Sequence, residues 1–556
     1  MQDSPSPDFP STEKNARRWL WWATPFTIVI LLGATLTPLD FDVREYHLQA
    51  PKEFYQQGRI AFLPHNVYGN MPLGSEMLPL AAMATLGDWW FGALCGKTVI
   101  ALAAPLTAVG LLAAGRRFVG GAGGVVAALV FISIPWIARV SSLGLIEGVS
   151  ALYLWGTVYA MLLWWRADQD ERLPQLLLVG FLAGSAAACK YPNVLFVLAP
   201  AVAVVAARSW WLTKYAHDDC GHGTGAHKNA AAVKSLVGFL VAAAVACGPW
   251  FAKNWILTGN PTYPLAYDIF DGRTRTAELH AQWTRAHRPP GYGLRQAGDS
   301  LANIAWRSSW LSPLVLPLAI VGVAGACRRR LPMGLALYAA FVLGTWWLFT
   351  HRIDRFWVPI SPVLAFLAGM SVSPGGAIAW RWPVKLLLGT CLAANLLLIV
   401  AGGGGDTAYF VSLARLLKDP DRIHYWHRYL NEHLGTDDVV LTVGDAVVFD
   451  LEMPVLYTTV FDSDLFEELM RDHSADERRA ALAQRGVTHV AVDWAEIARY
   501  RAPGNYGFSD FVQPALFDEL VGQRVLDPPL RALDVAENSA GYDVFPVPRA
   551  STPRGE

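Results

Sequence analysis

Long apolar runs follow one another along the first 402 residues of the 556-residue chain. Each is about 20 residues long, the length that an α-helix needs to cross the hydrocarbon core of a bilayer. Tryptophan pairs such as Trp164-Trp165 stand at the ends of several runs, as at membrane interfaces. The pattern predicts an α-helical polytopic membrane protein of about 11 transmembrane helices. Their expected ranges are 19–39, 89–114, 121–138, 143–165, 173–189, 193–212, 232–256, 311–326, 332–350, 356–374 and 383–402.

Basic residues are distributed unevenly between the connections. Every second connection is rich in Lys and Arg, beginning with the polar tail 1–18 and continuing near Arg116, Arg166, Lys214, Arg328 and Arg381. Cytoplasmic segments carry that excess. We therefore expect a multi-pass protein of the cell (inner or plasma) membrane with a cytoplasmic N-terminal tail, 1–18. The outer loops 40–88 and 257–310 of the transmembrane region 19–402, and residues 403–556, are then extracytoplasmic. Within the first loop, residues 45–60 fit an amphipathic helix at the interface.

After a glycine run at 402–405 the chain takes on the character of a soluble domain. Acidic residues exceed basic ones, and short β-rich runs at 439–443, 455–460, 488–492 and 542–547 alternate with helical stretches. Such alternation is typical of α/β folds. We expect a small C-terminal extracytoplasmic α/β domain over residues 403–556.

Charge and cysteine content exclude several classes. The formal net charge is −1, so no basic field attracts nucleic acid. The six cysteines mostly lie in or beside apolar runs, and none falls in the C-terminal region. We therefore expect neither a disulfide framework nor a metal site built from cysteines.

Two carboxylates are expected at the boundary between water and lipid. Asp42 follows the first apolar run, and Glu147 lies inside the run 143–165. A carboxylate in the membrane costs several kcal/mol unless it faces a polar cavity or a partner, so Glu147 is a functional candidate. Each also has a structural explanation: Asp42 can mark the exit of a helix into water, and Glu147 can pair with Arg139 or another helix.

Four cations are expected near the same outer face: Arg139, Lys190, Arg352 and Arg355. Each alone would serve as a snorkelling anchor. Together with the two carboxylates they indicate a site for an anionic headgroup beside an acid/base pair.

These residues and their order resemble the GT-C superfamily of membrane glycosyltransferases over about residues 19–400. The chain is most similar to the bacterial branch with lipopolysaccharide-modifying sugar transferases and protein O-mannosyltransferase-like enzymes. One departure is that many relatives carry adjacent acidic residues in the first loop, whereas Asp42 and Glu45 are three apart. The resemblance is carried by Asp42, Tyr46-His47, His65, Glu76, Glu147, Lys190-Tyr191, the run 258–264 and Arg355-Phe356-x-x-Pro359.

The resemblance implies transfer of a hexosyl or pentosyl group, with inversion, from a polyprenyl-phosphate carrier to an extracytoplasmic lipid, glycan or protein. Asp42 would accept the proton of the acceptor. Glu147 would orient the acceptor, Asp42 or a divalent cation, whose involvement stays open. Lys190, Arg352 and Arg355 would stabilise the departing lipid phosphate. Further substrate contacts are expected from Tyr46, His47, His65, Glu76 and Tyr191.

A polytopic transporter or flippase of lipid-linked or anionic substrates is the alternative. Transporters usually show internal repeats and broken helices with polar groups at mid-membrane. Here the charged candidates gather at the expected outer ends of the spans, which favours the transferase.

Overall fold

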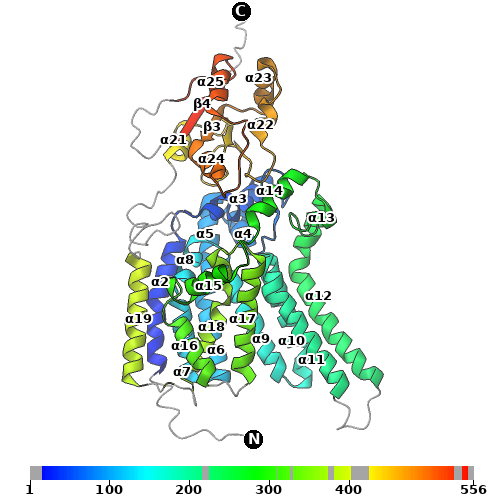
Figure 1. The fold of residues 1–556 in the computed structure, drawn as a ribbon, viewed down its shortest axis with the longest axis vertical. Helices are drawn as coiled ribbons and strands as arrows, with labels where there is room; N and C mark the ends of the chain where they lie inside the picture. The colour runs from blue at the N-terminus through cyan, green and yellow to red at the C-terminus, as the bar shows by residue number, and fades with distance from the viewer. Residues whose placement is uncertain are drawn as a thin grey trace, which may run out of the picture. The chain divides into compact units, whose positions relative to one another are not determined.

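The computed structural model describes residues 16–215, 225–308, 310–325, 330–373, 378, 381–401, 425–530 and 541–548. The chain divides into two compact units (Figure 1). The helical unit comprises Met1–Pro38, Pro72–Lys253 and Pro289–Pro420. The mixed unit comprises Leu39–Met71, Asn254–Arg288 and Asp421–Glu556, so it unites parts of both expected outer loops with the C-terminal region.

Most helices of the chain belong to the helical unit. Its elements are η1 (Arg18–Trp22), α2 (Ala23–Ala34), α4 (Met77–Leu86), α5 (Trp89–Ala101), α6 (Ala103–Phe118), α7 (Gly121–Ile132), α8 (Pro135–Leu143), α9 (Glu147–Arg166), α10 (Gln169–Cys189), η4 (Val194–Leu198), α11 (Ala199–Tyr215), most of α12 (Gly225–Thr258), α15 (Leu294–Ala302), η5 (Asn303–Arg307), α16 (Val315–Gly325), α17 (Arg330–Phe349), η6 (Asp354–Ile360), α18 (Ser361–Met370) and α19 (Trp382–Ala401).

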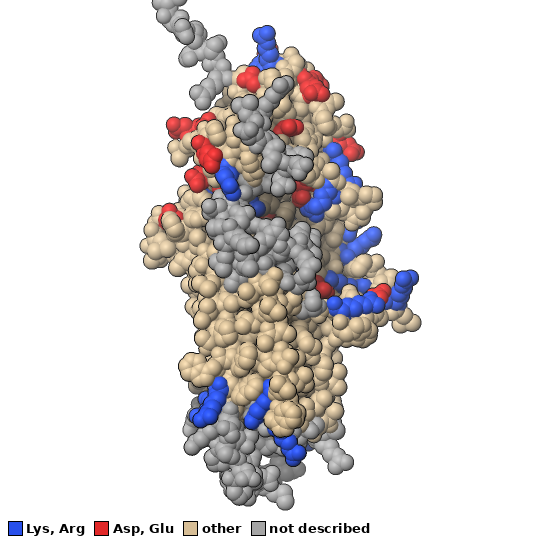
Figure 2. Space-filling model, turned by 90° about the vertical axis from the view of Figure 1, so that its left-hand side faces the viewer, with Lys and Arg blue, Asp and Glu red and all other residues tan. Residues whose placement is uncertain are grey.

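Among the described residues, six helices are long and apolar enough to cross a membrane. They are Trp89–Phe118, Arg172–Cys189, Val194–Trp211, Ala232–Thr258, Arg330–Phe349 and Trp382–Ala401. Helices α7 and α8 together make a seventh candidate, bent by 57°. The face in Figure 2 shows a broad belt of uncharged side chains over the helices, with Lys and Arg at one end of it. A polytopic helical membrane protein is thus confirmed, while the number of eleven spans stays a prediction.

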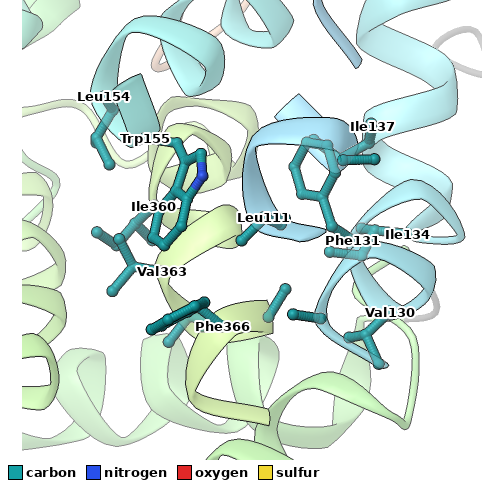
Figure 3. Packing of buried hydrophobic residues seen from close by; sticks show 14 of the residues in the cluster. Leu111, Val130, Phe131, Ile134, Ile137, Leu154, Trp155, Ile360, Val363 and Phe366 are labelled. Atoms are coloured by element: carbon teal, nitrogen blue, oxygen red, sulfur yellow. The ribbon is translucent and has the colours of Figure 1, made fainter. Parts of the chain in front are cut away.

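The core of the helical unit lies where α6, α7, α9 and α18 meet (Figure 3). The Trp155 and Phe366 rings pack with centroids 4.9 Å apart. Helices α6 and α7 cross at Gly115 and Gly124, where a Cβ on Gly115 would lie 2.1 Å from the Gly124 Cα. Small residues allow such close packing in membranes. This packing holds the helix α9, which begins at Glu147.

A four-stranded sheet with strand order β2-β1-β3-β4 forms the centre of the mixed unit. Strand β1 is parallel to β2 and β3, and β4 is antiparallel to β3. Each strand overlaps one of the four β-rich runs. The elements are α21 (Tyr425–His433), β1 (Val440–Val443), β2 (Val455–Leu456), α22 (Leu465–Met470), α23 (Ala475–Gln484), β3 (His489–Asp493), α24 (Trp494–Arg501), α25 (Pro514–Gly522) and β4 (Tyr542–Pro546).

Leu39–Met71 of the expected first outer loop, which we call the first outer segment, belong to this unit. It forms η2 (Val43–His47), α3 (Gln49–Gln57) and η3 (Tyr68–Asn70), and the segment 254–288 adds α13 (Tyr267–Phe270) and α14 (Ala277–His287). The Lys52 ammonium donates to the carbonyl oxygens of Phe449 and Leu451, at 2.9 and 2.5 Å. The six consecutive residues Gln49–Phe54 are all buried. The expectation of an interfacial helix is therefore wrong, because protein covers every side of the first turns of α3.

Candidate active site

Glu147 is the first residue of α9 and is 1% exposed. Helix α8 ends at Gly144, whose φ of 86° is a conformation that glycine adopts readily, and the chain turns there into α9. A carboxylate in the first turn is favoured by the partial positive charge of a helix N-terminus. The turn thus places a buried carboxylate at a helix start.

Two cations from other elements reach this carboxylate. The Lys190 Nζ lies 2.9 Å from Glu147 Oε1, and the Arg355 Nε lies 3.6 Å from the same oxygen. Lys190 follows the end of α10, and Arg355 lies in η6. Three residues predicted to share a site are therefore brought together. Arg139, a partner considered for Glu147, lies against the Trp136 and Trp310 rings, at 5.6 and 5.4 Å.

Phe356 completes this cluster. The Lys190 Nζ lies 3.7 Å from the centroid of its ring, and the Arg355 guanidinium carbon lies 5.7 Å from it. A cation over an aromatic face is attracted by the ring quadrupole. The Asn193 amide donates to the Ser150 hydroxyl, at 2.9 Å, and ties the turn after Lys190 to α9. We call Glu147, Lys190, Arg355 and Phe356 the charged cluster.

Two other predicted residues, Glu76 and Tyr191, lie near the elements that carry this cluster. Glu76 is buried and accepts a hydrogen bond from Ser75, at 2.7 Å. The preceding Gly74 N–H donates to the Ala188 carbonyl, at 2.8 Å, beside the end of α10. The Tyr191 ring lies 6.1 Å from that of Phe251 in α12.

The Arg352 side chain binds backbone carbonyl groups around the loop before η6. Its φ is 61°, and its side chain donates to the carbonyl oxygens of Trp347, at 2.9 Å, and of Gly291. Its guanidinium carbon also lies 4.2 Å from the Trp347 ring. These contacts close the loop that precedes Arg355, and binding of a phosphate by Arg352 stays a prediction.

Asp42 directly precedes the π-helix η2 of the mixed unit. The Tyr46 hydroxyl donates to Asp42 Oδ2, at 3.3 Å. The Tyr46 ring stacks on Tyr68, with centroids 5.0 Å apart, and lies 4.1 Å from the His47 ring. Asp42 is therefore hydrogen-bonded to a tyrosine that packs on Tyr68 and His47, and it does not only mark a helix end. Because it lies in a different unit from Glu147, a cavity shared by the two stays a prediction.

Glu45 is buried in the same π-helix. Burial raises the pKa of Glu45 well above its usual range, and the nearby charge of Asp42 acts in the same direction. Burial therefore favours the protonated form of Glu45 beside Asp42.

His65 is the partner of a carboxylate that sequence reasoning missed. Its Nε2 lies 2.9 Å from Glu53 Oε2, and Glu53 also accepts from the Tyr457 hydroxyl, at 2.6 Å. Burial opposes the charge of His65, but the hydrogen bond and charge of Glu53 outweigh it and raise the pKa of His65. His65 therefore joins the first outer segment to the C-terminal region.

Two solved structures share the fold of this chain. ArnT from Cupriavidus metallidurans in the apo state aligns with a TM-score of 0.57 and 14% identity, over 96% of this chain and 98% of that one. The structure of ArnT from Cupriavidus metallidurans bound to undecaprenyl phosphate aligns with a TM-score of 0.57 and 13% identity, over 95% of this chain and 97% of that one. The family described as dolichyl-phosphate-mannose-protein mannosyltransferase matches residues 91–221. No curated protein sequence matches significantly.

Residues 91–221 thus match a mannosyltransferase family, and nearly the whole chain shares the ArnT fold. A transporter or flippase is not favoured, because the family match is to sugar transferases. The region of the family match includes Glu147, Lys190 and Tyr191.

Sequence reasoning missed an aromatic cluster next to Tyr46. We define it as Tyr68, Trp283, His287, Phe461 and Tyr506. The Trp283 ring stacks on His287, with centroids 3.8 Å apart, and Phe461 lies 5.1 Å from both Trp283 and Tyr506. The aromatic content of the segment 257–310 was the only signal in the sequence. Within the described part of the chain, no group of three or more His, Cys, Asp or Glu is arranged to hold a metal ion.

Proposed function

We propose that this protein is an inverting membrane glycosyltransferase of the GT-C superfamily, which moves a hexosyl or pentosyl group from a polyprenyl-phosphate carrier to an extracytoplasmic acceptor. The observation that carries the proposal is the charged cluster. It brings two cations to one carboxylate in a buried place. Cations fixed in this way suit the oxygens of a lipid phosphate, and the related fold of ArnT has been solved with undecaprenyl phosphate bound.

The chemistry assigns a role to each group. The Asp42 carboxylate accepts the proton of the acceptor hydroxyl while its oxygen attacks the anomeric carbon of the donor. The bond between that carbon and the phosphate oxygen breaks, and the electron pair leaves with the lipid phosphate. Lys190 and Arg355 stabilise the charge that develops on the phosphate. Glu147 holds both cations in place, and Tyr46 orients Asp42 through its hydrogen bond.

The proposal includes an orientation in the cell membrane. The N-terminal tail 1–18 lies in the cytoplasm, about eleven helices span the membrane, and the region 403–556 lies outside. The polyprenyl-phosphate sugar and the acceptor then meet on the outer side. The asymmetry of basic residues between the connections supports this orientation.

A transfer assay tests the function. The purified protein in proteoliposomes is given undecaprenyl-phosphate hexoses or pentoses together with envelope extract of a deletion strain, and new glycosides are followed by mass spectrometry. We expect one donor to be consumed and undecaprenyl phosphate to be released, with loss of both in Asp42→Asn. If no donor of either class is turned over, and the envelopes of deletion and parent strains are identical, the proposal is wrong.

A further inference from the structure

The mixed unit contains a cleft of about 750 Å³ that the proposed mechanism does not use. It runs between α14 and two segments of the C-terminal region, residues 458–472 and 506–509. Every residue that lines it belongs to the mixed unit. Its volume is in the range of known small-molecule sites, about 300–1,000 Å³.

The walls of the cleft are tied together by Gln282. Its amide donates to the carbonyl oxygens of Val460 and Tyr506, at 3.1 Å each. These bonds connect α14 to both segments of the opposite wall. The cleft is therefore a built feature of the unit and not a gap between loosely packed loops.

The charge of the cleft excludes anionic ligands. Six carboxylates line it against two guanidiniums. Glu467 already pairs with Arg471, Asp464 caps α22, and the Asp462 carboxylate accepts from Thr459, at 2.6 Å. The exposed carboxylates Glu278, Glu468 and Asp472 face solvent at the cleft. Such groups accept hydrogen bonds from hydroxyl and ammonium donors.

Two half-buried aromatic side chains, Tyr506 and Phe508, also line the cleft. The Phe508 ring stacks on Tyr500, with centroids 6.1 Å apart, and Tyr506 lies 5.1 Å from Phe461. Aromatic surface beside carboxylates and the hydroxyls of Thr458 and Ser509 suits a ligand with both polar edges and apolar faces. A pyranose ring is such a ligand.

The cleft is connected to Asp42 within the same unit. Tyr506 belongs both to the cleft and to the aromatic cluster, and Phe461 of that cluster lies 6.1 Å from Tyr68. Tyr68 stacks on Tyr46, which donates to Asp42. A ligand in the cleft would thus bind in the same unit as the proposed base.

We propose that this cleft binds the acceptor, and that the acceptor is a saccharide of neutral or amino-bearing rings without negative charge. The identification of the ligand as the acceptor rests on the proposed function. The cleft as a saccharide site stands by itself. Its carboxylates would take the hydroxyl and ammonium groups of the ligand, and Phe508 would pack on a ring face.

Binding without donor tests the cleft independently of transfer. The full-length protein in lipid nanodiscs is titrated calorimetrically with four probes: a glucosamine tetrasaccharide, an N-acetylglucosamine tetrasaccharide, a galacturonate tetrasaccharide and a tetralysine peptide. We expect both glucosamine-based probes to bind and galacturonate to bind at least tenfold more weakly. The inference would be overturned if neither glucosamine-based probe binds at millimolar concentration. It would also be overturned if galacturonate binds equally well, or if tetralysine binds tenfold more tightly.

Matched variants locate the binding. A triple variant combines Glu278→Gln, Glu468→Gln and Asp472→Asn. It should weaken binding of the glucosamine probe about tenfold, and Phe508→Ala should weaken binding of both glucosamine-based probes. The control Glu432→Gln with Asp437→Asn removes exposed carboxylates of the same unit outside the cleft and should change nothing. Unchanged binding in the triple variant would place the ligand elsewhere.

Transfer kinetics separate the two proposals. The triple variant should raise the KM for acceptor and leave kcat nearly unchanged, whereas Asp42→Asn should abolish transfer without loss of probe binding. Transfer with an unchanged KM in the triple variant would contradict the acceptor site but not the transferase activity. Probe binding without transfer from any donor would support the saccharide site and contradict the transferase activity.

Discussion

Lys190 and Glu147 form an ion pair across 43 residues of sequence, with Nζ 2.9 Å from Oε1. The carboxylate is nearly inaccessible and the ammonium is 19% exposed, so the pair presents its positive end. Arg355 approaches the same carboxylate oxygen. One buried carboxylate thus holds two cations from separate elements in place.

Removal of that carboxylate should destabilise the helical unit. Breaking a buried pair from one side costs about 3–5 kcal/mol, because the other charge stays buried and unpaired. We therefore expect Glu147→Gln to lower the midpoint of thermal unfolding in detergent by several degrees. Glu147→Gln with Lys190→Met should recover part of the loss, and a double variant no more stable than the single one would contradict the pairing.

Arg355→Lys should lower turnover about tenfold or more, because one charge-assisted hydrogen bond is worth roughly 1.5–3 kcal/mol. Lysine keeps the charge but loses the planar fork that holds a phosphate. The rate is measured in proteoliposomes at saturating donor and acceptor. Arg59→Lys, at an exposed position, is the matched control. Full activity in both Arg355→Lys and Arg355→Ala would mean that Lys190 or Arg352, and not Arg355, binds the phosphate.

Asp42 and Glu45 should respond differently to isosteric substitution. A general base contributes about 10²–10⁴-fold to a rate, so Asp42→Asn should lose at least a hundredfold in kcat. Burial raises the pKa of Glu45 and so favours its protonated form, which Gln resembles, and Glu45→Gln should retain most of the activity. Initial rates with a common donor give both values. The reverse order of the two variants would assign the base to Glu45.

The mixed unit should lose stability at alkaline pH through His427. Its ring nitrogens lie 2.8 Å from Asp445 Oδ2 and 3.2 Å from Asp450 Oδ1, and Arg44 lies 2.7 Å from the same Asp450 oxygen. Burial opposes the charge of His427, but the two carboxylates outweigh it and raise its pKa to about 9. A raised pKa stabilises the fold fully below the unfolded value of about 6.5, and the stabilisation is lost as the pH rises through 9.

The measurement is thermal unfolding of the mixed unit, followed by near-UV circular dichroism at pH 6.5 and pH 9. The unsubstituted protein should lose more stability between these two values than His427→Gln does. Asp445 has its pKa lowered to about 2, so its contribution is lost only in strong acid and does not interfere. Equal slopes in the two proteins would show that His427 is not charged in the folded state.

Orientation is open to a direct test. A phosphatase reporter fused after residue 410 should be active, since that enzyme works only after export, and a fusion at the N-terminus should be inactive. A fluorescent reporter that folds only in the cytoplasm provides the complementary control. Activity with the opposite pattern would overturn the outer location of the charged cluster and of Asp42.

The residues of the charged cluster could be predicted, because charge in a membrane is costly and must find a partner. That cost singled out Glu147, and Lys190 and Arg355 stood at helix breaks expected on the same face. The contacts of Arg352 could not be predicted, since they depend on a positive φ and on carbonyl oxygens of Trp347 and Gly291. Likewise the pair of His65 with Glu53 is completed by Tyr457, which no local pattern connects to the first outer segment.

The burial of α3 was missed for the same reason. Its amphipathic sequence fits a membrane surface as well as a protein surface. The atoms that cover it, among them the Phe449 carbonyl oxygen bound by Lys52, come from residues 397 positions later. Local pattern predicts the helix itself, and only the assembled unit shows what covers it.

The contact between Lys52 and Phe449 also sets an order of events during synthesis. With 397 residues between the two, and about 5–20 residues added per second, roughly 20–80 seconds pass before the partner of Lys52 exists. Throughout that interval the first outer segment has left the ribosome with its burial sites uncovered, while the later helices are still being inserted. Completion of the mixed unit is therefore a late step of biogenesis, and truncation before residue 449 leaves α3 without its cover.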